Sequence, residues 1–138
     1  MNRSWIFVTF VPLSSVGFIL YHFGSLPWTP VRVVGLILSL LAFSLLTVAR
    51  VHLGSSFSLT PQARQLVTQG IYSRIRHPVY LFSTLGLAGL ALYVQMPLLL
   101  ATLAIVIPVQ VMRARAEERV LEDRFGDAYR AWRATTWF

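Results

Sequence analysis

Two short segments of the chain hold most of the residues that could do chemistry. One is the stretch 66–80, which reads LVTQGIYSRIRHPVY, and the other is the stretch 113–118, which reads RARAEE. Imidazole, carboxylate and guanidinium groups can carry protons and bind polar or charged ligands. The candidate side chains are Tyr72, His77 and Tyr80 in the first segment and Arg113, Glu117 and Glu118 in the second.

Long runs without charged residues surround these two segments. Arg3 and Arg32 bracket 28 uncharged residues, Arg32 and Arg50 bracket 17, and Arg76 and Arg113 bracket 36. As a single helix the last run would be about 54 Å long, whereas the hydrocarbon layer of a membrane is about 30 Å thick. This run must therefore fold back, and its central Gln-Met-Pro sequence is the natural position for the turn.

The uncharged runs predict an all-α integral membrane protein. The composition agrees, because 56% of the 138 residues are hydrophobic, only 12% are charged and the mean hydropathy is +0.64. Soluble globular domains carry about twice that share of charged residues. We expect a single domain over 1–138 with spans at 5–23, 31–50, 79–95 and 97–112, a loop over 51–78 and a tail over 113–138.

The charge pattern indicates a membrane face rather than a nucleic-acid partner. All 12 basic residues are arginines, the net charge is +7, and the arginines flank the apolar runs, as the positive-inside rule describes. With both termini cytoplasmic, eleven arginines lie on the cytoplasmic side and only Arg32 lies outside. The chain has no cysteine, no H-E-x-x-H sequence and no glycine-rich phosphate loop, so we expect no metal site.

The predicted hairpin over 79–112 returns the chain to the membrane face from which it started. Pro78 suits the first turn of a helix, which holds His77 at that helix's N-terminus. His77 can then approach Glu117, although forty residues separate them. We therefore expect the loop over 51–78 and the C-terminal helix to bring these polar side chains together at the cytoplasmic face.

A purely structural interpretation of the same residues also stands. The aromatic residues could be interfacial and the arginines could be anchors beside the membrane. The charges after residue 112 could form a solvated helix face, with pairs such as Arg115–Glu118 and Arg119–Asp123 at helical spacing.

The two segments together resemble a known family. The patterns L-V-x-x-G-x-Y-x-x-x-R-H-P-x-Y and R-x-x-x-E-E-x-x-L-x-x-x-F-G-x-x-Y-x-x-W, joined by an apolar hairpin, are similar to those of the isoprenylcysteine carboxyl methyltransferases and their relatives among the phospholipid N-methyltransferases. The resemblance covers about 64–133 with order and spacing intact. It departs from the family in two ways, because the chain has fewer spans than several relatives and Phe57 stands nearest to where some members use a glutamine.

The resemblance implies an integral membrane enzyme that transfers a methyl group from S-adenosylmethionine to a lipid-like acceptor, with a cytoplasmic cofactor pocket formed by the 50–78 loop and the C-terminal helix. The positions that match cofactor-pocket residues are Leu66, Val67, Tyr72, His77, Pro78, Tyr80 and Glu117. Arg113 matches an arginine on the acceptor side, and Glu118 completes the catalytic pair. The matches that look structural are Gly70, Arg76, Gly126 and Tyr129.

The acceptor is predicted to be a lipid or a prenylated, hydrophobic molecule that enters from the bilayer. Carboxyl O-methylation is favoured over N-methylation of a phospholipid amine, because Arg113 could orient a carboxylate. An NADPH-dependent membrane reductase and a non-catalytic membrane scaffold are the other hypotheses. The absence of lysine suggests a GC-rich genome and hence a bacterial inner membrane.

Overall fold

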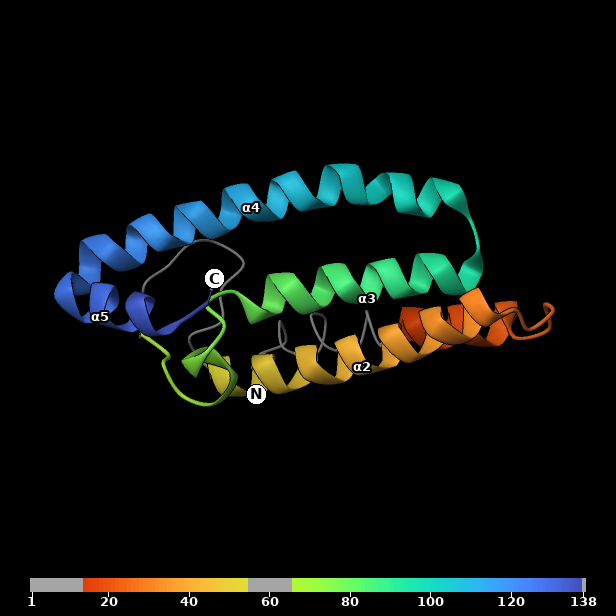
Figure 1. Cartoon of the computed structure of the whole chain (residues 1–138), viewed down its shortest axis with the longest axis horizontal. Coiled ribbons are helices and arrows are strands. Elements are labelled where there is room, and N and C mark those ends of the chain that lie inside the picture. The colour runs from red at the N-terminus through yellow and green to blue at the C-terminus, as the bar shows by residue number, and fades with distance from the viewer. Residues whose placement is uncertain (1–13, 55–65, 138) are drawn as a thin grey trace.

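The computed structural model describes residues 14–54 and 66–137. The chain is helical over 14–23 and then forms α2 (Pro30–Leu53), the short 3₁₀ helix η2 (Gly70–Ser73), α3 (Pro78–Val94), α4 (Pro97–Phe125) and α5 (Asp127–Thr135). No strand occurs in these two stretches, which confirms the all-α expectation for them. Figure 1 shows α2, α3 and α4 side by side, with α5 returning toward η2.

Small residues allow α2 and α3 to pack closely. A Cβ atom on Gly35 would lie 2.5 Å from the backbone nitrogen of Tyr93, and one on Gly89 would lie 2.6 Å from the backbone nitrogen of Ser39. Larger side chains at these glycines would therefore force the two backbones apart. The sequence pair Gly35 and Ser39 thus marks the face of α2 that meets α3.

The predicted hairpin is present. Gln95 adopts the left-handed conformation (φ 58°) and Pro97 occupies the first turn of α4. α4 runs through Pro108 to Phe125, a length of about 43 Å, so one continuous helix includes the predicted span over 97–112 and the first part of the predicted C-terminal helix. The charged residues after 112 are good helix formers, so the helix continues until Gly126, whose positive φ ends it.

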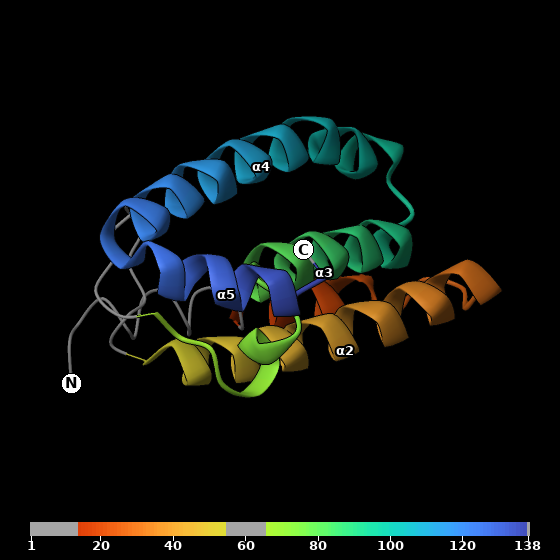
Figure 2. The same ribbon diagram turned by 60° about the vertical axis from the view of Figure 1, so that its left-hand side comes forward.

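Two of the described helices, α2 and α4, are long and apolar enough to cross a membrane. α3 is equally apolar but has 17 residues, or about 26 Å. No residue of α4 is buried, and apolar side chains such as Leu98, Ile105 and Met112 are at least 70% exposed. Figure 2 shows that α4 stands apart from the α2–α3 pair along much of its length. Such exposed apolar surface is typical of a membrane protein.

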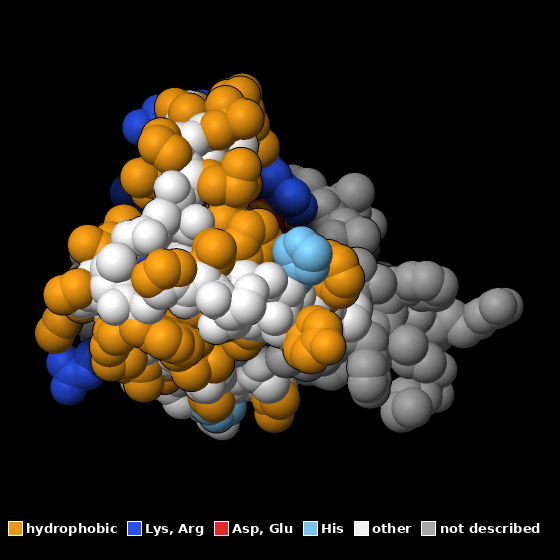
Figure 3. Space-filling model, turned by 90° about the vertical axis from the view of Figure 1, so that its right-hand side faces the viewer, with side chains coloured by type: hydrophobic (Ala, Val, Ile, Leu, Met, Phe, Trp, Pro, Cys, Tyr) orange, Lys and Arg blue, Asp and Glu red, His pale blue; other side chains and the backbone are white. Residues whose placement is uncertain are grey.

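Arg32 is a buried structural residue at one end of the bundle. Its guanidinium donates hydrogen bonds to the carbonyl oxygens of Phe23 and Pro27 and lies 4.6 Å from the ring centre of Tyr93 and 5.2 Å from that of Trp28. It therefore caps the helix over 14–23 instead of anchoring at a surface. Figure 3 shows that this end is covered mainly by hydrophobic and uncharged side chains.

Candidate functional site

The candidate site lies at the opposite end of the bundle, where η2 leads into α3. His77 is the N-cap residue of α3 and Pro78 follows in the first turn. A proline at that position lacks the N–H that would otherwise have no partner, and it keeps the preceding residue out of the helical conformation. The His77 side chain is consequently presented at the start of α3, facing α4.

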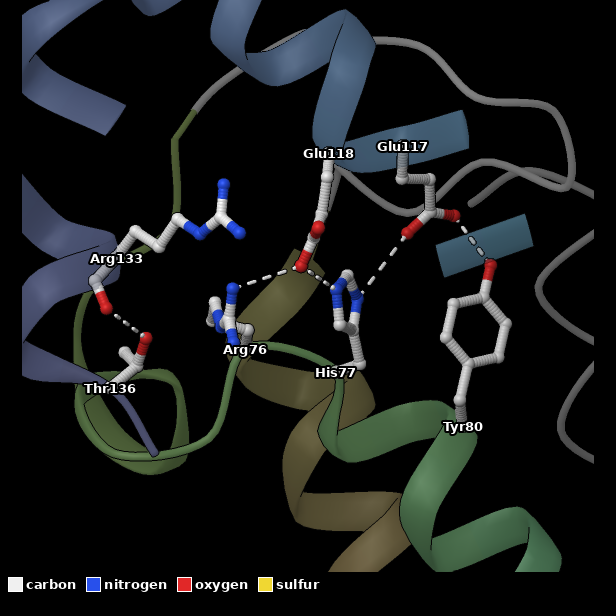
Figure 4. Close-up of polar contacts among 7 residues, drawn as sticks. All are labelled: Arg76, His77, Tyr80, Glu117, Glu118, Arg133 and Thr136. Atoms are coloured by element: carbon white, nitrogen blue, oxygen red, sulfur yellow. Dashed lines mark hydrogen bonds and ion pairs between the residues drawn. The ribbon is translucent and has the colours of Figure 1, made fainter. Parts of the chain in front are cut away.

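Two consecutive carboxylates of α4 flank the imidazole ring, as Figure 4 shows. His77 Nε2 lies 3.0 Å from Glu118 Oε1, and His77 Nδ1 lies 4.0 Å from Glu117 Oε2. Arg76 Nη1 donates to the same Glu118 oxygen at 3.0 Å, while the Tyr80 hydroxyl donates to Glu117 Oε1 at 2.5 Å. The ring therefore sits in a fixed position between two anionic groups that are themselves held by Arg76 and Tyr80.

Arg113 adds a second positive group on the side of this cluster that leads into the apolar part of α4. Its guanidinium carbon lies 5.8 Å from the centre of the Tyr80 ring, within the range of a cation–π contact. Arg113 and Glu117 are one helical turn apart on α4 and so face α3 together. The centres of the His77 and Tyr80 rings are 5.9 Å apart. The aromatic and charged groups together form one half-buried surface.

The phenol of Tyr72 lies behind the cluster and remains neutral. Burial raises the pKa of Tyr72 above that of a free tyrosine, and the nearby Glu117 carboxylate raises it further. Arg50, at the C-terminal end of α2, acts on Tyr72 in the opposite direction. The sequence analysis did not assign Arg50 to this region. Its place in the last turn of a predicted span, next to the polar loop, could have indicated that it lies near the site.

The C-terminal helix α5 holds η2 in place. The indole nitrogen of Trp132 donates to the carbonyl of Tyr72 at 2.9 Å, and the backbone nitrogen of Trp137 donates to the carbonyl of Arg74 at 2.9 Å. Tyr129 is fully buried, and this burial raises the pKa of its phenol, with a further contribution from Glu118. The Y-x-x-W end of the sequence motif therefore supports the site rather than lining it.

The structure brings together most, but not all, of the residues singled out from the sequence. His77, Tyr80, Arg113, Glu117 and Glu118 form one cluster. Tyr72 lies behind it, and Pro78 is a buried helix start. Leu66 and Val67 are half-buried in the extended segment before η2, and within the described stretches no hydrogen bond or ion pair joins them to the cluster. Phe57 lies outside the described residues.

The ion pairs of the tail differ from the local pairs expected on a solvated helix. Glu118 binds Arg76 and His77, which are distant in sequence, instead of Arg115. Glu122 pairs with Arg130 of α5. For Glu118 the distant partners are favoured because this part of α4 packs over the N-terminus of α3, where a pair shielded from water is worth more than a fully exposed one. The pairs of Arg130 with Glu122 and Asp127 are both exposed.

The arrangement can bind a ligand that is both cationic and rich in hydroxyl groups. The Glu117 carboxylate, which has about four acceptor positions, accepts one hydrogen bond from Tyr80, and its side chain is 29% exposed. It can therefore accept further hydrogen bonds. The aromatic faces beside it suit a positively charged sulfonium or ammonium group.

A comparison with models of protein families identifies the family of this chain. The model of a family described as phospholipid methyltransferase matches residues 29–128. The chain belongs to this family. The matched region runs from the start of α2 to the start of α5 and contains the whole cluster. Comparisons with curated proteins and with solved structures gave no match.

Membership confirms the resemblance drawn from the sequence motifs at the level of the family. It supports a membrane methyltransferase that acts on a lipid-like substrate, in agreement with the apolar, exposed helices. The described residues contain no group of three or more His, Cys, Asp or Glu side chains that could hold a metal ion. Both acceptors considered from the sequence, a carboxylate and a phospholipid amine, are compatible with the family.

Proposed function

We propose that the protein transfers a methyl group from S-adenosylmethionine to a lipid-like acceptor, and that the acceptor group is a carboxylate. When bound, S-adenosylmethionine supplies an activated methyl group on a sulfonium. The observation that carries the proposal is the cluster in which His77, at the start of α3, lies between Glu117 and Glu118. We assign cofactor binding to the residues Leu66, Val67, Tyr72, His77, Pro78, Tyr80 and Glu117.

The two residues assigned to catalysis from the sequence have different parts in this proposal. Arg113, beside the Tyr80 ring, orients the acceptor carboxylate and fixes its direction of approach. Glu118 is already bound to Arg76 and His77, so it acts as a positioning residue for the imidazole. A carboxylate needs no base, because its oxygen is ionised at neutral pH.

An amine acceptor is the second candidate, and one contact favours it. A phospholipid amine must lose a proton before or during methylation. If His77 donates from Nε2 to Glu118, its Nδ1 is left as an acceptor, in the direction of Glu117. That nitrogen could take the proton of an ammonium group.

We also propose how the chain lies in the membrane. The spans are the segment that includes helix 14–23, followed by α2, α3 and the apolar part of α4. Both termini and the cluster lie on the cytoplasmic side, where the cofactor is available and where eleven arginines gather. The bacterial inner membrane is the expected location.

Cofactor binding is the first test, measured by calorimetry on detergent-purified protein. Wild type should bind S-adenosylmethionine with micromolar affinity. Glu117→Ala and His77→Ala should each weaken binding at least tenfold, which is about 1.4 kcal/mol. Asp123→Ala, which removes an exposed carboxylate from the same helix, should bind like wild type. No binding by folded wild type would overturn the proposal, and binding of NADPH instead would support a reductase.

The acceptor is identified by the bond that forms. Protein in liposomes is given S-adenosylmethionine labelled in the methyl group, with either a prenylated cysteine or phosphatidylethanolamine as acceptor. A methyl ester releases volatile labelled methanol in mild alkali, whereas an N-methyl group stays on its nitrogen and releases none. We expect alkali-labile product from the prenylated cysteine; alkali-stable product on phosphatidylethanolamine would establish the amine alternative.

A further inference from the structure

A second polar cluster lies deeper between α3 and α4, within the apolar part of the hairpin. Gln110 Nε2 donates to Ser83 Oγ at 3.1 Å, and Thr84 Oγ1 lies 2.6 Å from Gln110 Oε1. The uncharged run from 77 to 112 that contains all three residues is otherwise strongly apolar. Polar side chains at membrane depth are expensive unless they pair or serve a ligand.

This cluster continues the face that carries the candidate site. On α4, Gln110, Arg113 and Glu117 are spaced by three and four residues and so lie on one face. On α3, Tyr80 is followed at the same spacings by Ser83 and Thr84. Gln110 therefore lies about 4.5 Å from Arg113 along the helix axis, on the side away from the His77 cluster. An acceptor that enters from the bilayer would pass it before reaching Arg113.

The hydrogen bonds of the cluster leave capacity for a ligand. The Gln110 amide has two N–H donors and an oxygen with two acceptor positions, and the contacts above use one of each. The Thr84 hydroxyl, which has a single proton, lies within reach of both the Gln110 oxygen and the Tyr80 carbonyl, 2.9 Å away. It can donate to only one of them at a time. Because Gln110 is half-buried, its remaining N–H can reach a group placed between the helices.

We propose that Gln110, with Ser83 and Thr84, is a specificity-determining subsite for a carbonyl group of the acceptor, placed between its methyl-accepting end and its hydrocarbon tail. The inference rests on the proposed function and deepens it. The carbonyl belongs either to an amide beside the accepting group or to an ester of a glycerolipid. In both cases the Gln110 N–H donates to the carbonyl oxygen.

Matched acceptor pairs test this subsite. One pair is a prenylated thioether carboxylate with an acetamide beside the carboxylate, and the same molecule without the acetamide. The other is diacyl and dialkyl-ether phosphatidylethanolamine. For the pair that wild type methylates, Gln110→Leu should raise the KM of the carbonyl-bearing acceptor at least tenfold. The KM of its counterpart and the dissociation constant of S-adenosylmethionine should change less than twofold.

Two further sets of variants separate ligand recognition from helix packing. Thr102→Val removes a hydroxyl of α4 whose one partner among the described residues is the Leu99 carbonyl of the same helix, and it should leave the KM of both acceptors unaffected. If Gln110→Leu fails to fold, Ser83→Ala and Thr84→Val are measured instead, and each should show the same selective rise in KM. The affinity for S-adenosylmethionine provides the check that the cofactor end is intact.

The outcomes distinguish this inference from the proposed function. Equal KM changes for the two members of a pair, or a loss of stability with no change in selectivity, would show that Gln110 only joins the helices, and would overturn the subsite while the methyltransferase stands. Absence of S-adenosylmethionine binding in wild type would overturn the proposed function and the subsite with it. Selectivity for the amide pair or for the ester pair would identify the source of the carbonyl.

Discussion

Removing the ion pair between Arg76 and Glu118 should lower the free energy of unfolding far more than removing a pair of similar length that another glutamate of α4 forms. The two charged groups of the site are 3.0 Å apart, and their side chains are only 15% and 22% exposed. The matched control is Arg130 and Glu122, which are 2.9 Å apart but 64% and 37% exposed. In both pairs one member has a further partner, His77 for Glu118 and Asp127 for Arg130.

The structure sets the size of the difference. A hydrogen bond to a charged group contributes about 1.5–3 kcal/mol when it is shielded from water. We therefore expect a coupling free energy of about 2 kcal/mol between Arg76 and Glu118. Solvent screens the control pair, so its coupling should be several times smaller. The comparison isolates burial, because the distances are nearly equal.

Double-mutant cycles measure both couplings. Arg76→Gln, Glu118→Gln and the double variant are compared with wild type, and Arg130→Gln, Glu122→Gln and their double variant form the second cycle. The free energy of unfolding is followed by tryptophan fluorescence as SDS is added to mild detergent micelles. Equal couplings in the two cycles, or none at Arg76 and Glu118, would refute the argument that shielding makes this pair strong.

Three other predictions concern the supports of the site. Gly35→Ala should lower the free energy of unfolding by about 1–3 kcal/mol, because its Cβ would meet the α3 backbone. Gly17→Ala, with nothing within 4 Å, should leave it unchanged or raise it by up to about 1 kcal/mol, because alanine favours a helix more than glycine does. Trp132→Phe removes the hydrogen bond to the Tyr72 carbonyl and should cost about 1 kcal/mol in the same SDS titration, with a smaller loss of S-adenosylmethionine affinity than His77→Ala. Because the pKa values of Tyr72 and Tyr129 are both raised, absorbance at 295 nm should show a component that ionises above the usual range near pH 10, and Tyr72→Phe should reduce the amplitude of that late component without removing it. The stability from the neutral phenol is complete below about pH 10 and is lost as the pH rises toward the folded-state pKa, so Tyr72→Phe should also flatten the alkaline loss of stability.

The sequence was sufficient to predict the hairpin and the approach of its two ends. Local signals carry these features, because Pro78 and Pro97 begin helices and the length of the uncharged run requires a turn between them. Those signals bring the two ends of the hairpin together, but they do not determine which side chains pair there. The pairing of Glu118 with Arg76, and the burial of Arg32 against Tyr93, depend on which helix ends meet. Helical spacing alone would pair Glu118 with the nearer Arg115.

The continuity of α4 explains why two consecutive glutamates can serve one histidine. Neighbouring residues on a helix point about 100° apart, so Glu117 and Glu118 cannot both face the same atom. They can, however, face the two sides of a ring placed between them, and His77 presents Nδ1 to one and Nε2 to the other. This geometry exists only because the helix continues past residue 112 without a break and brings the pair over the start of α3. A proline between Arg113 and Glu117 would remove a backbone hydrogen bond and kink the helix there, which would shift the pair relative to the ring.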